Sequence, residues 1–182
     1  INELYKVNND QIYACGTSAG GRMSCQLAAE LPHRIAAIAN NAGGISSGII
    51  KNLELNRPMP YLHIHGTEDS YGTAVIAVAF WKDLNICSDP DTFIIPDINL
   101  EDNSTVEKFT YINKGTGCEV VHYKVINGGH TWPGSAYDIP SVGNTNRDIS
   151  ASEEMWNFFK QYRLSELSFP DHDTFSRSTP LN

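Results

Sequence analysis

One glycine-rich stretch, Gly16-Thr17-Ser18-Ala19-Gly20-Gly21, constrains the fold of this chain more than any other feature. A short apolar run over residues 12–15 precedes it. Apolar residues follow it at positions 23, 27 and 31, which is the spacing of one face of a helix. Glycine adopts the backbone angles that a sharp turn beside a serine requires. The stretch therefore predicts a strand over 11–16, a tight turn at Ser18 and a helix over 19–31.

The pattern G-x-S-x-G between a strand and a helix is the pattern of a nucleophile elbow. An elbow lifts the Ser18 hydroxyl out of the sheet and directs the Ala19 N–H toward a developing oxyanion. The same letters also occur by chance in glycine-rich loops, so the flanking strand and helix carry the interpretation. The elbow predicts acyl transfer, most often ester hydrolysis.

The rest of the chain alternates strands and helices. This alternation predicts an α/β fold, in which helices cover both faces of a mostly parallel sheet. A loop is expected over 45–60, an irregular acidic segment over 88–104, and a hairpin between the two strands nearest the C-terminus. Ser150 and Glu153 form a capping box that starts the last helix. The other expected strands cover 35–39, 61–65, 106–112 and 119–126, and the other expected helix covers 73–85.

The length of 182 residues favours one domain. We expect the catalytic domain to span residues 1–164. The polar segment 165–182 reads as a loosely held tail.

Three polar residues each follow a predicted strand: Ser18, Asp69 and His130. The carboxyl ends of parallel strands meet at one edge of a sheet, where ligands bind. A serine needs a base to take its proton, and that base is usually a histidine held by a carboxylate. The order Ser, Asp, His is that of α/β-hydrolases. We therefore expect a catalytic set of Ser18, Asp69 and His130.

Each of these residues has rivals. Glu68 is the immediate alternative to Asp69, which is preferred because it stands at a fixed short offset after a strand and a tight turn. Among the histidines, His130 alone combines a position after a strand with two preceding glycines and a place beyond the acid. His65 lies near the same edge and could support the site. Trp132 either lines a substrate pocket or packs beneath its loop.

The charge composition excludes some classes of binding partner. Thirteen basic against 21 acidic side chains give a net charge of −8, which argues against nucleic acid and anionic membrane surfaces. No apolar run is long enough to cross a bilayer. The expected partner is a small or polymeric ester.

The four cysteines contain no C-x-x-C pair, so we expect no metal, and the chemistry needs no organic cofactor. Cys15 and Cys25 lie in the strand and helix of the elbow, where buried thiols are expected. Cys87 and Cys118 lie in loop-rich sequence and could either pair or stay free.

The residues quoted so far resemble the esterases related to polyhydroxybutyrate depolymerases and feruloyl esterases, an α/β-hydrolase group. The most specific match is Gly129-His130-Thr131-Trp132-Pro133-Gly134. The matching pieces follow the order of that group and lie at 12–21, 65–69, 117–120, 128–134 and 151–159.

The resemblance implies a serine esterase with Ser18 as nucleophile, Asp69 as acid and His130 as base. It also implies a disulfide between Cys87 and Cys118 near the catalytic loops. Members of the group are commonly exported, so we expect a secreted or periplasmic protein, and a start without Met suits a trimmed product. The expected substrates are hydroxyalkanoate, feruloyl, acetyl or simple aryl esters.

Two departures from the group stand out. After Asp69 the chain reads Ser70-Tyr71-Gly72-Thr73 instead of a turn with proline, in a loop that borders the substrate. Few residues precede the elbow strand, whereas a βαβ unit takes roughly 30. We therefore expect the C-terminal part of an α/β-hydrolase, completed by a preceding segment or by a second chain. The alternatives are another acyl hydrolase such as a peptidase, or a non-catalytic binding fragment.

Overall fold

A six-stranded mixed sheet forms the centre of the computed structural model, which describes residues 4–53 and 55–168. The strand order is β1-β2-β3-β6-β5-β4. The first four strands in that order run parallel, and β5 and β4 run antiparallel to their neighbours. The α/β prediction is confirmed at this level. The strands are β1 (Tyr13–Thr17), β2 (Ala37–Asn41), β3 (Tyr61–Gly66), β4 (Asp91–Ile95), β5 (Thr105–Ile112) and β6 (Glu119–Ile126).

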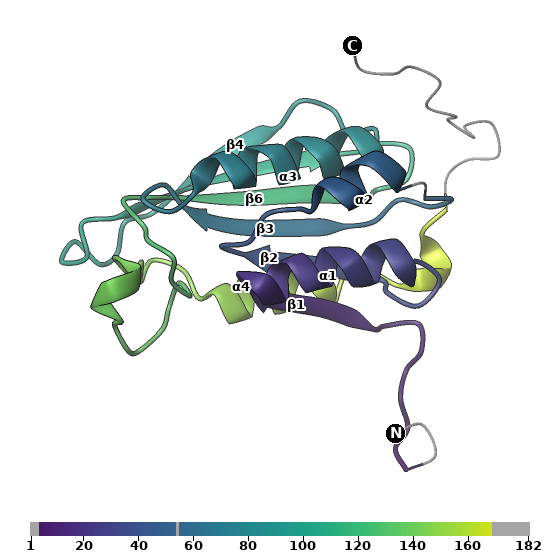
Figure 1. Ribbon diagram of the computed structural model, residues 1–182, viewed down its shortest axis with the longest axis horizontal. Coiled ribbons are helices and arrows are strands. Elements are labelled where there is room, and N and C mark those ends of the chain that lie inside the picture. Colours follow the sequence, from purple (N-terminus) through teal and green to yellow (C-terminus); the bar gives the residue numbers. More distant parts are fainter. Residues whose placement is uncertain (1–3, 54, 169–182) are drawn as a thin grey trace.

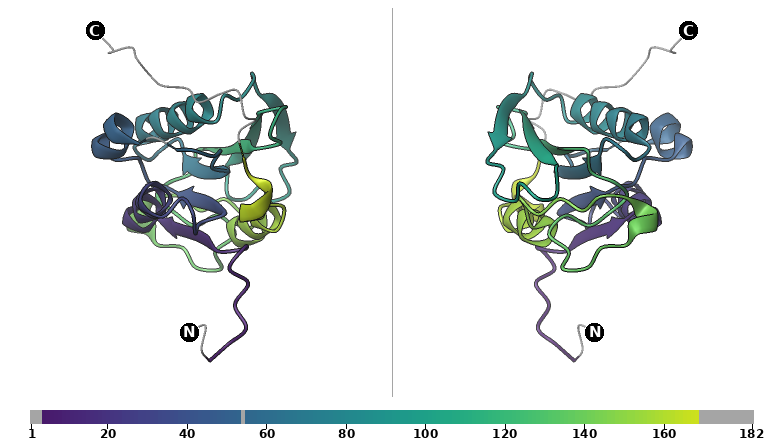
Figure 2. Two further views of the ribbon diagram at one scale, coloured as in Figure 1. Left: turned by 90° about the vertical axis from the view of Figure 1, so that its right-hand side faces the viewer. Right: turned by 90° about the vertical axis from the view of Figure 1, so that its left-hand side faces the viewer.

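Helices cover both faces of this sheet (Figures 1 and 2). Three of them lie on one face: α1 (Ala19–Glu30), α2 (Ser47–Asn52) and α3 (Tyr71–Leu84). The other face is covered by α4 (Ala151–Phe159). One half of the predicted capping box is present, because the Ser150 hydroxyl accepts a hydrogen bond from the Glu153 N–H. Two short 3₁₀ turns complete the described elements, at Pro140–Val142 and Leu164–Glu166.

Strand residues alternate between the two resulting cores, as the period of two requires. On the side of α1 and α3, Ile38 and Tyr61 pack against Trp81. On the side of α4, Leu62 and Ile64 pack with Phe158. All positions of β2 and β3 are buried, which is the pattern of parallel strands covered on both faces.

Two short elements differ from the sequence expectations. Helix α2 lies within the expected loop 45–60. It has six residues, too few for a periodic pattern, and Ser46 caps it by accepting from the Ile49 N–H. Strand β4 lies within the segment expected to be irregular. Most of its residues are exposed, because it is an edge strand held only by β5, so it lacks the apolar alternation of a half-buried strand.

Helix α1 also faces the sheet differently from the apolar spacing. Met23 is 57% exposed, and the buried positions are Gly21, Ser24, Cys25 and Ala28. Small residues face the sheet because the helix packs closely against β1 and β2. Adding a Cβ to Gly21, for example, would place it 1.9 Å from the Asn40 side-chain oxygen.

The cysteine expectations need two corrections. Cys15 is exposed rather than buried, because β1 pairs only with β2 among the described residues and its other side is open. The disulfide between Cys87 and Cys118 is not formed, and both residues are free thiols. The Cys87 thiol points at the backbone oxygen of Cys118, 4.0 Å away, instead of at its sulfur. Desolvation raises the pKa of both thiols, that of Cys87 to about 11, which keeps them protonated.

The first part of the expected tail is tied to the body of the protein. Leu167 is buried in the core beneath α4, and the Ser165 N–H donates to the Asp10 carboxylate at 2.8 Å. Residues 169–182 lie outside the described part of the chain. Within the described residues, every helix is too short or too polar to cross a bilayer.

Candidate active site

A pocket of about 210 Å³ opens where the parallel strands end. Its walls come from the turns after β1, β2, β3 and β6, from the first turn of α1 and from the first two turns of α3. The predicted nucleophile and base both line it. The lining residues are Ser18, Arg22, Ala42, Gly43, Gly44, Ile45, Ser70, Thr73, Ile76 and His130.

Ser18 stands in a backbone conformation that L residues rarely adopt, with φ 56° and ψ −114°. Such a conformation costs about 1–3 kcal/mol and persists only where the surroundings enforce it. Here the Ser18 N–H donates to the Asn41 carbonyl at 2.8 Å, and the Ser18 carbonyl accepts from the Arg22 N–H. A Cβ on Gly16 would lie 2.6 Å from the Gly20 backbone, so the turn requires glycine there. A strand, a sharp turn and a helix thus follow one another around Ser18.

The Ser18 side chain is partly exposed, and its hydroxyl makes no hydrogen bond within the described residues. It therefore does not cap α1. The Ala19 N–H is the first of that helix, where backbone donors have no carbonyl of the same helix to bind. Within the described part of the chain, a free hydroxyl and a free backbone donor thus stand on adjacent residues, and Ser18 lines the pocket.

Asp69 and His130 come together from two different turns. The Asp69 carboxylate accepts from His130 Nδ1 at 2.7 Å. The turns are joined through their backbones, because the Glu68 N–H donates to the Gly128 carbonyl. They also approach too closely for a side chain at Gly66, where a Cβ would lie 2.1 Å from that same carbonyl oxygen.

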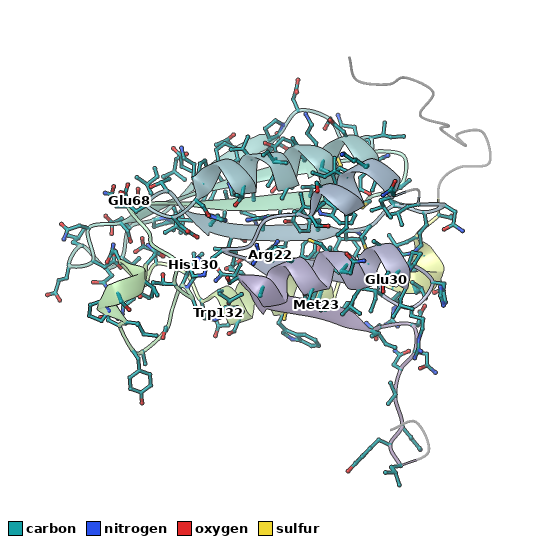
Figure 3. The ribbon with its side chains drawn as sticks, viewed as in Figure 1. Arg22, Met23, Glu30, Glu68, His130 and Trp132 are labelled. Atoms are coloured by element: carbon teal, nitrogen blue, oxygen red, sulfur yellow. The ribbon has the colours of Figure 1, made fainter. Side chains whose placement is uncertain are left out.

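The loop carrying His130 is fixed to β2 as well. The buried Asn41 side chain donates to the Thr131 carbonyl at 2.8 Å. Glu68, the rival acid, is exposed, and Figure 3 shows it apart from His130. The structure therefore brings Asp69, and not Glu68, to the histidine.

The pKa of Asp69 lies below its ordinary value. Partial desolvation alone would raise it, but the hydrogen bond from His130, the Ser70 backbone N–H and the nearby His65 together outweigh that penalty. The carboxylate is consequently ionised at neutral pH. Because it holds Nδ1 of His130, the other ring nitrogen is left to face the pocket.

A column of buried polar side chains stands behind Asp69. His65 Nε2 lies 3.1 Å from the carboxylate oxygen that also binds His130, although the angle is poor for a hydrogen bond. His65 Nδ1 is 3.1 Å from His63 Nε2, and His63 Nδ1 bonds the Tyr61 hydroxyl. The column runs along β3 and ends at the carboxylate.

One arrangement of the ring and hydroxyl protons satisfies the hydrogen bonds of this column. Burial lowers the pKa of His63 and of His65, so both rings are neutral and each carries one N–H. A proton on His65 Nε2 faces the carboxylate favourably. His65 Nδ1 must then accept from His63 Nε2, and His63 Nδ1 must accept from the Tyr61 hydroxyl. Every donor in the column thus points toward Asp69.

His122 on β6 packs against the same column. Its ring is 5.6 Å from that of His63, and its Nε2 is 3.0 Å from the Tyr71 hydroxyl. Desolvation lowers its pKa to about 4, outweighing the hydrogen bond to the His63 carbonyl. Three imidazoles are therefore buried in the uncharged state.

These buried imidazoles predict acid destabilisation. The unfolded chain binds protons on His63, His65 and His122 below the ordinary pKa of 6.5, whereas the folded chain does not until a lower pH. Stability is therefore complete above pH 6.5 and falls as the pH drops toward about 4. For His122 alone the loss is on the order of 3 kcal/mol.

Urea unfolding between about pH 7 and about pH 5 measures this loss. The His122→Gln variant should show a shallower dependence of the free energy of unfolding on pH, since glutamine does not titrate. His33→Gln, at an exposed histidine, is the control and should keep the original slope. Equal free energies of unfolding at both pH values would contradict the prediction.

Trp132 lies outside the lining of this pocket. Its ring packs against the core beneath α4, and its Nε1 donates to the Ser152 hydroxyl at 3.2 Å. Figure 3 shows it on the loop that follows His130. Its predicted contact with substrate stays a prediction, and it would require a substrate that extends beyond the pocket.

Sequence reasoning passed over several residues of the pocket wall, most notably Arg22. Arg22 follows Ser18 by four residues, which is one turn of α1, and this spacing could have signalled its place beside the nucleophile. Ser70 and Thr73 also line the wall, in the turn that departs from the resembled group. Among the described residues, no cluster of His, Cys, Asp or Glu could hold a metal ion.

Comparison with known proteins finds distant relatives. No protein-family profile matches the chain. NocK of Nocardia uniformis subsp. tsuyamanensis, which is named as an esterase, is 29% identical over 184 residues. The match covers 84% of this chain and 52% of NocK, so the chain spans about half the length of that relative.

A second relative is the bifunctional acetylxylan esterase/xylanase XynS20E of Neocallimastix patriciarum. It is 25% identical over 186 residues, which cover all of this chain and 25% of that protein. Both relatives carry the name of an esterase, so the chain has distant homologues among proteins named as esterases.

Proposed function

We propose that this chain carries the catalytic residues of a serine ester hydrolase: Ser18 as nucleophile, His130 as base and Asp69 as the acid that orients it. One observation carries the proposal. The Asp69 carboxylate binds His130 at 2.7 Å, and that histidine shares a pocket with a serine held at φ 56°. Distant similarity to two proteins named as esterases supports the same chemistry.

The proposed reaction starts when His130 takes the proton of the Ser18 hydroxyl as its oxygen attacks the ester carbonyl. Asp69 holds Nδ1–H of His130, which leaves Nε2 free to accept. Catalytic hydrogen bonds often reach their working distance only with substrate bound, so an unpaired Ser18 hydroxyl is compatible with this step. His130 next protonates the departing alcohol, and then activates the water that releases the acyl group from Ser18.

The Ala19 N–H is the proposed donor to the tetrahedral oxyanion, because it follows the nucleophile and stands first in α1. A second donor would come from a preceding segment or a second chain. The side of β1 that does not face β2 is where such a segment would join the sheet, since no described strand pairs there. Losing one oxyanion donor typically costs on the order of 10²–10³ in turnover.

The proposed substrates are carboxylic esters, with hydroxyalkanoate, feruloyl, acetyl and simple aryl esters as the classes to test first. XynS20E is named as an acetylxylan esterase, which adds weight to acetyl groups. The resemblance to exported esterases also suggests a secreted or periplasmic protein, and we retain that as part of the proposal.

Labelling with a fluorophosphonate tests the proposed nucleophile directly. The reagent phosphonylates a serine that an adjacent base activates, and peptide mass spectrometry should find the label on Ser18 alone. Rates on p-nitrophenyl acetate and on the matching p-nitroanilide then separate an esterase from a peptidase. A folded chain that takes no label and hydrolyses neither would be a binding fragment instead.

His65 gives a further prediction, because its Nε2 lies within 3.1 Å of Asp69. Replacing His65 by Leu should lower kcat by about 10- to 100-fold, the value of one lost contact to a charged group. KM should change little, since His65 is buried and does not line the pocket. His65→Gln keeps an amide donor and should recover part of the lost kcat.

Steady-state kinetics of both variants check this, with circular dichroism to confirm folding. His33→Gln serves as the control at an exposed histidine. A folded His65→Leu enzyme with unchanged kcat would show that the column behind Asp69 has no part in positioning it.

A further inference from the structure

Arg22 is the only Lys, Arg, Asp or Glu among the residues that line the pocket. It shares the pocket with Ser18 and His130, and Figure 3 shows it on α1 near His130. Guanidinium groups remain charged throughout the pH range in which a His base operates. The pocket therefore carries a fixed positive charge one helical turn from the nucleophile.

The Arg22 side chain has no hydrogen bond or ion pair within residues 4–53 and 55–168. Two other arginines of that part are engaged: Arg57 donates to the Pro32 carbonyl, and Arg147 pairs with Asp138. Asp69, the acid behind the pocket, is bound by His130. The protein therefore leaves the Arg22 charge unmatched.

The rest of the lining is uncharged and partly apolar. Ala42, Ile45 and Ile76 provide aliphatic surface around the serine. The pocket has a volume of about 210 Å³. A short aliphatic group fits this space, and the positive charge of Arg22 favours an anionic end on that group.

We propose that Arg22 makes this pocket a subsite for esters whose acyl part ends in a carboxylate, such as half-esters of short dicarboxylic acids. The inference rests on the proposed ester hydrolase function. Arg22 follows Ser18 by one turn of α1, and the acyl part stays bonded to Ser18 in the acyl-enzyme, so we assign the anionic end to the acyl part. Hydrolysis is otherwise unchanged: the acyl carbon–oxygen bond breaks, and water supplies the atoms that complete the acid and the alcohol.

The positive charge of Arg22 would let this subsite attract a carboxylate to an acidic protein. With a net charge of −8, the protein as a whole repels a dicarboxylate, so binding needs a local cation. Arginine and carboxylate can form two parallel hydrogen bonds, the strongest common pairing of charged side chains. The attraction between exposed groups weakens with salt.

The test compares two ethyl esters of the same shape. Monoethyl glutarate carries the terminal carboxylate, and ethyl 5-methylhexanoate replaces it with an isopropyl group. The readout is the ratio of the kcat/KM values, followed as acid release in a pH-stat. We expect the ratio to favour the charged ester about tenfold at low salt and to fall with added salt. Arg22→Gln should remove that preference.

Arg34→Gln is the matched control, because it removes the same charge from an exposed arginine outside the pocket. It should leave the ratio unchanged. Arg22→Lys keeps the charge without the planar pair of donors and should retain part of the preference. A wild-type enzyme that hydrolyses both esters without preference, or an Arg22→Gln enzyme that keeps the preference, would overturn the subsite.

Binding of glutarate to the Ser18→Ala protein, measured by calorimetry, needs no activity and separates the two proposals. If neither ester is hydrolysed but glutarate binds and Arg22→Gln weakens it about tenfold, the subsite stands and the hydrolase function fails. If neutral esters are hydrolysed but glutarate does not bind, the hydrolase stands and the subsite fails.

Discussion

Replacing Ser18 by Ala should lower kcat on p-nitrophenyl acetate by on the order of 10⁴- to 10⁶-fold, the range seen when a serine hydrolase loses its nucleophile. No acyl-enzyme can form without the hydroxyl, so only the bound geometry and the Ala19 N–H would remain to favour attack by water. The fold should be retained, because the Ser18 hydroxyl bonds nothing within the described residues.

Release of p-nitrophenol by equal amounts of the wild-type and Ser18→Ala proteins measures the effect. Ser88→Ala is the control, since this exposed serine lies outside the pocket and should keep full activity. Comparable rates in the wild-type and Ser18→Ala proteins would mean that another group performs the reaction. The predicted nucleophile would then be wrong, however well the turn resembles an elbow.

The elements that the sequence predicted well are those with strong local signals. The helix after Ser18 follows from the glycine turn and ends before Pro32, and β3 and β6 follow from their apolar runs. Element α2 is a single short helix with one buried residue, Ile49, and β4 is an exposed edge strand. Neither buries enough apolar surface to leave a periodic pattern, so both escaped prediction.

The residues of the candidate site also differ in how far the sequence could predict them. Ser18, Asp69 and His130 could be proposed together because parallel strands bring their carboxyl ends to one edge. The structure places Asp69 in contact with His130, two of these three residues. The column of Tyr61, His63 and His65 could not be foreseen. Alternation along β3 shows only that the three share a face, whereas their mutual bonding depends on rotamers and on how closely α3 covers them.

Replacing Asp69 by Asn should lower kcat by about 10⁴-fold while leaving the shape of the site intact. The amide can donate to His130 Nδ1, which would move the ring proton to Nε2. Nε2 would then face Ser18 as a donor and could not take the hydroxyl proton. KM should change much less than kcat, because Asp69 does not line the pocket.

Glu68→Gln is the decisive comparison, since Glu68 precedes Asp69 and is the other carboxylate of the turn. Its side chain is exposed and does not contact His130, so its loss should change kcat by less than about twofold, the equivalent of the roughly 0.5 kcal/mol within which most surface substitutions change stability. If Glu68→Gln proved the damaging variant and Asp69→Asn the harmless one, the turn would have to rearrange when substrate binds. If both were harmless, His130 would need no carboxylate at all, and the pairing at 2.7 Å would have only a structural role. A large loss of kcat in Asp69→Asn alone would show that the contact with His130 serves catalysis. Both variants replace a carboxylate of the same turn by an amide, and only the Asp69 carboxylate reaches the histidine.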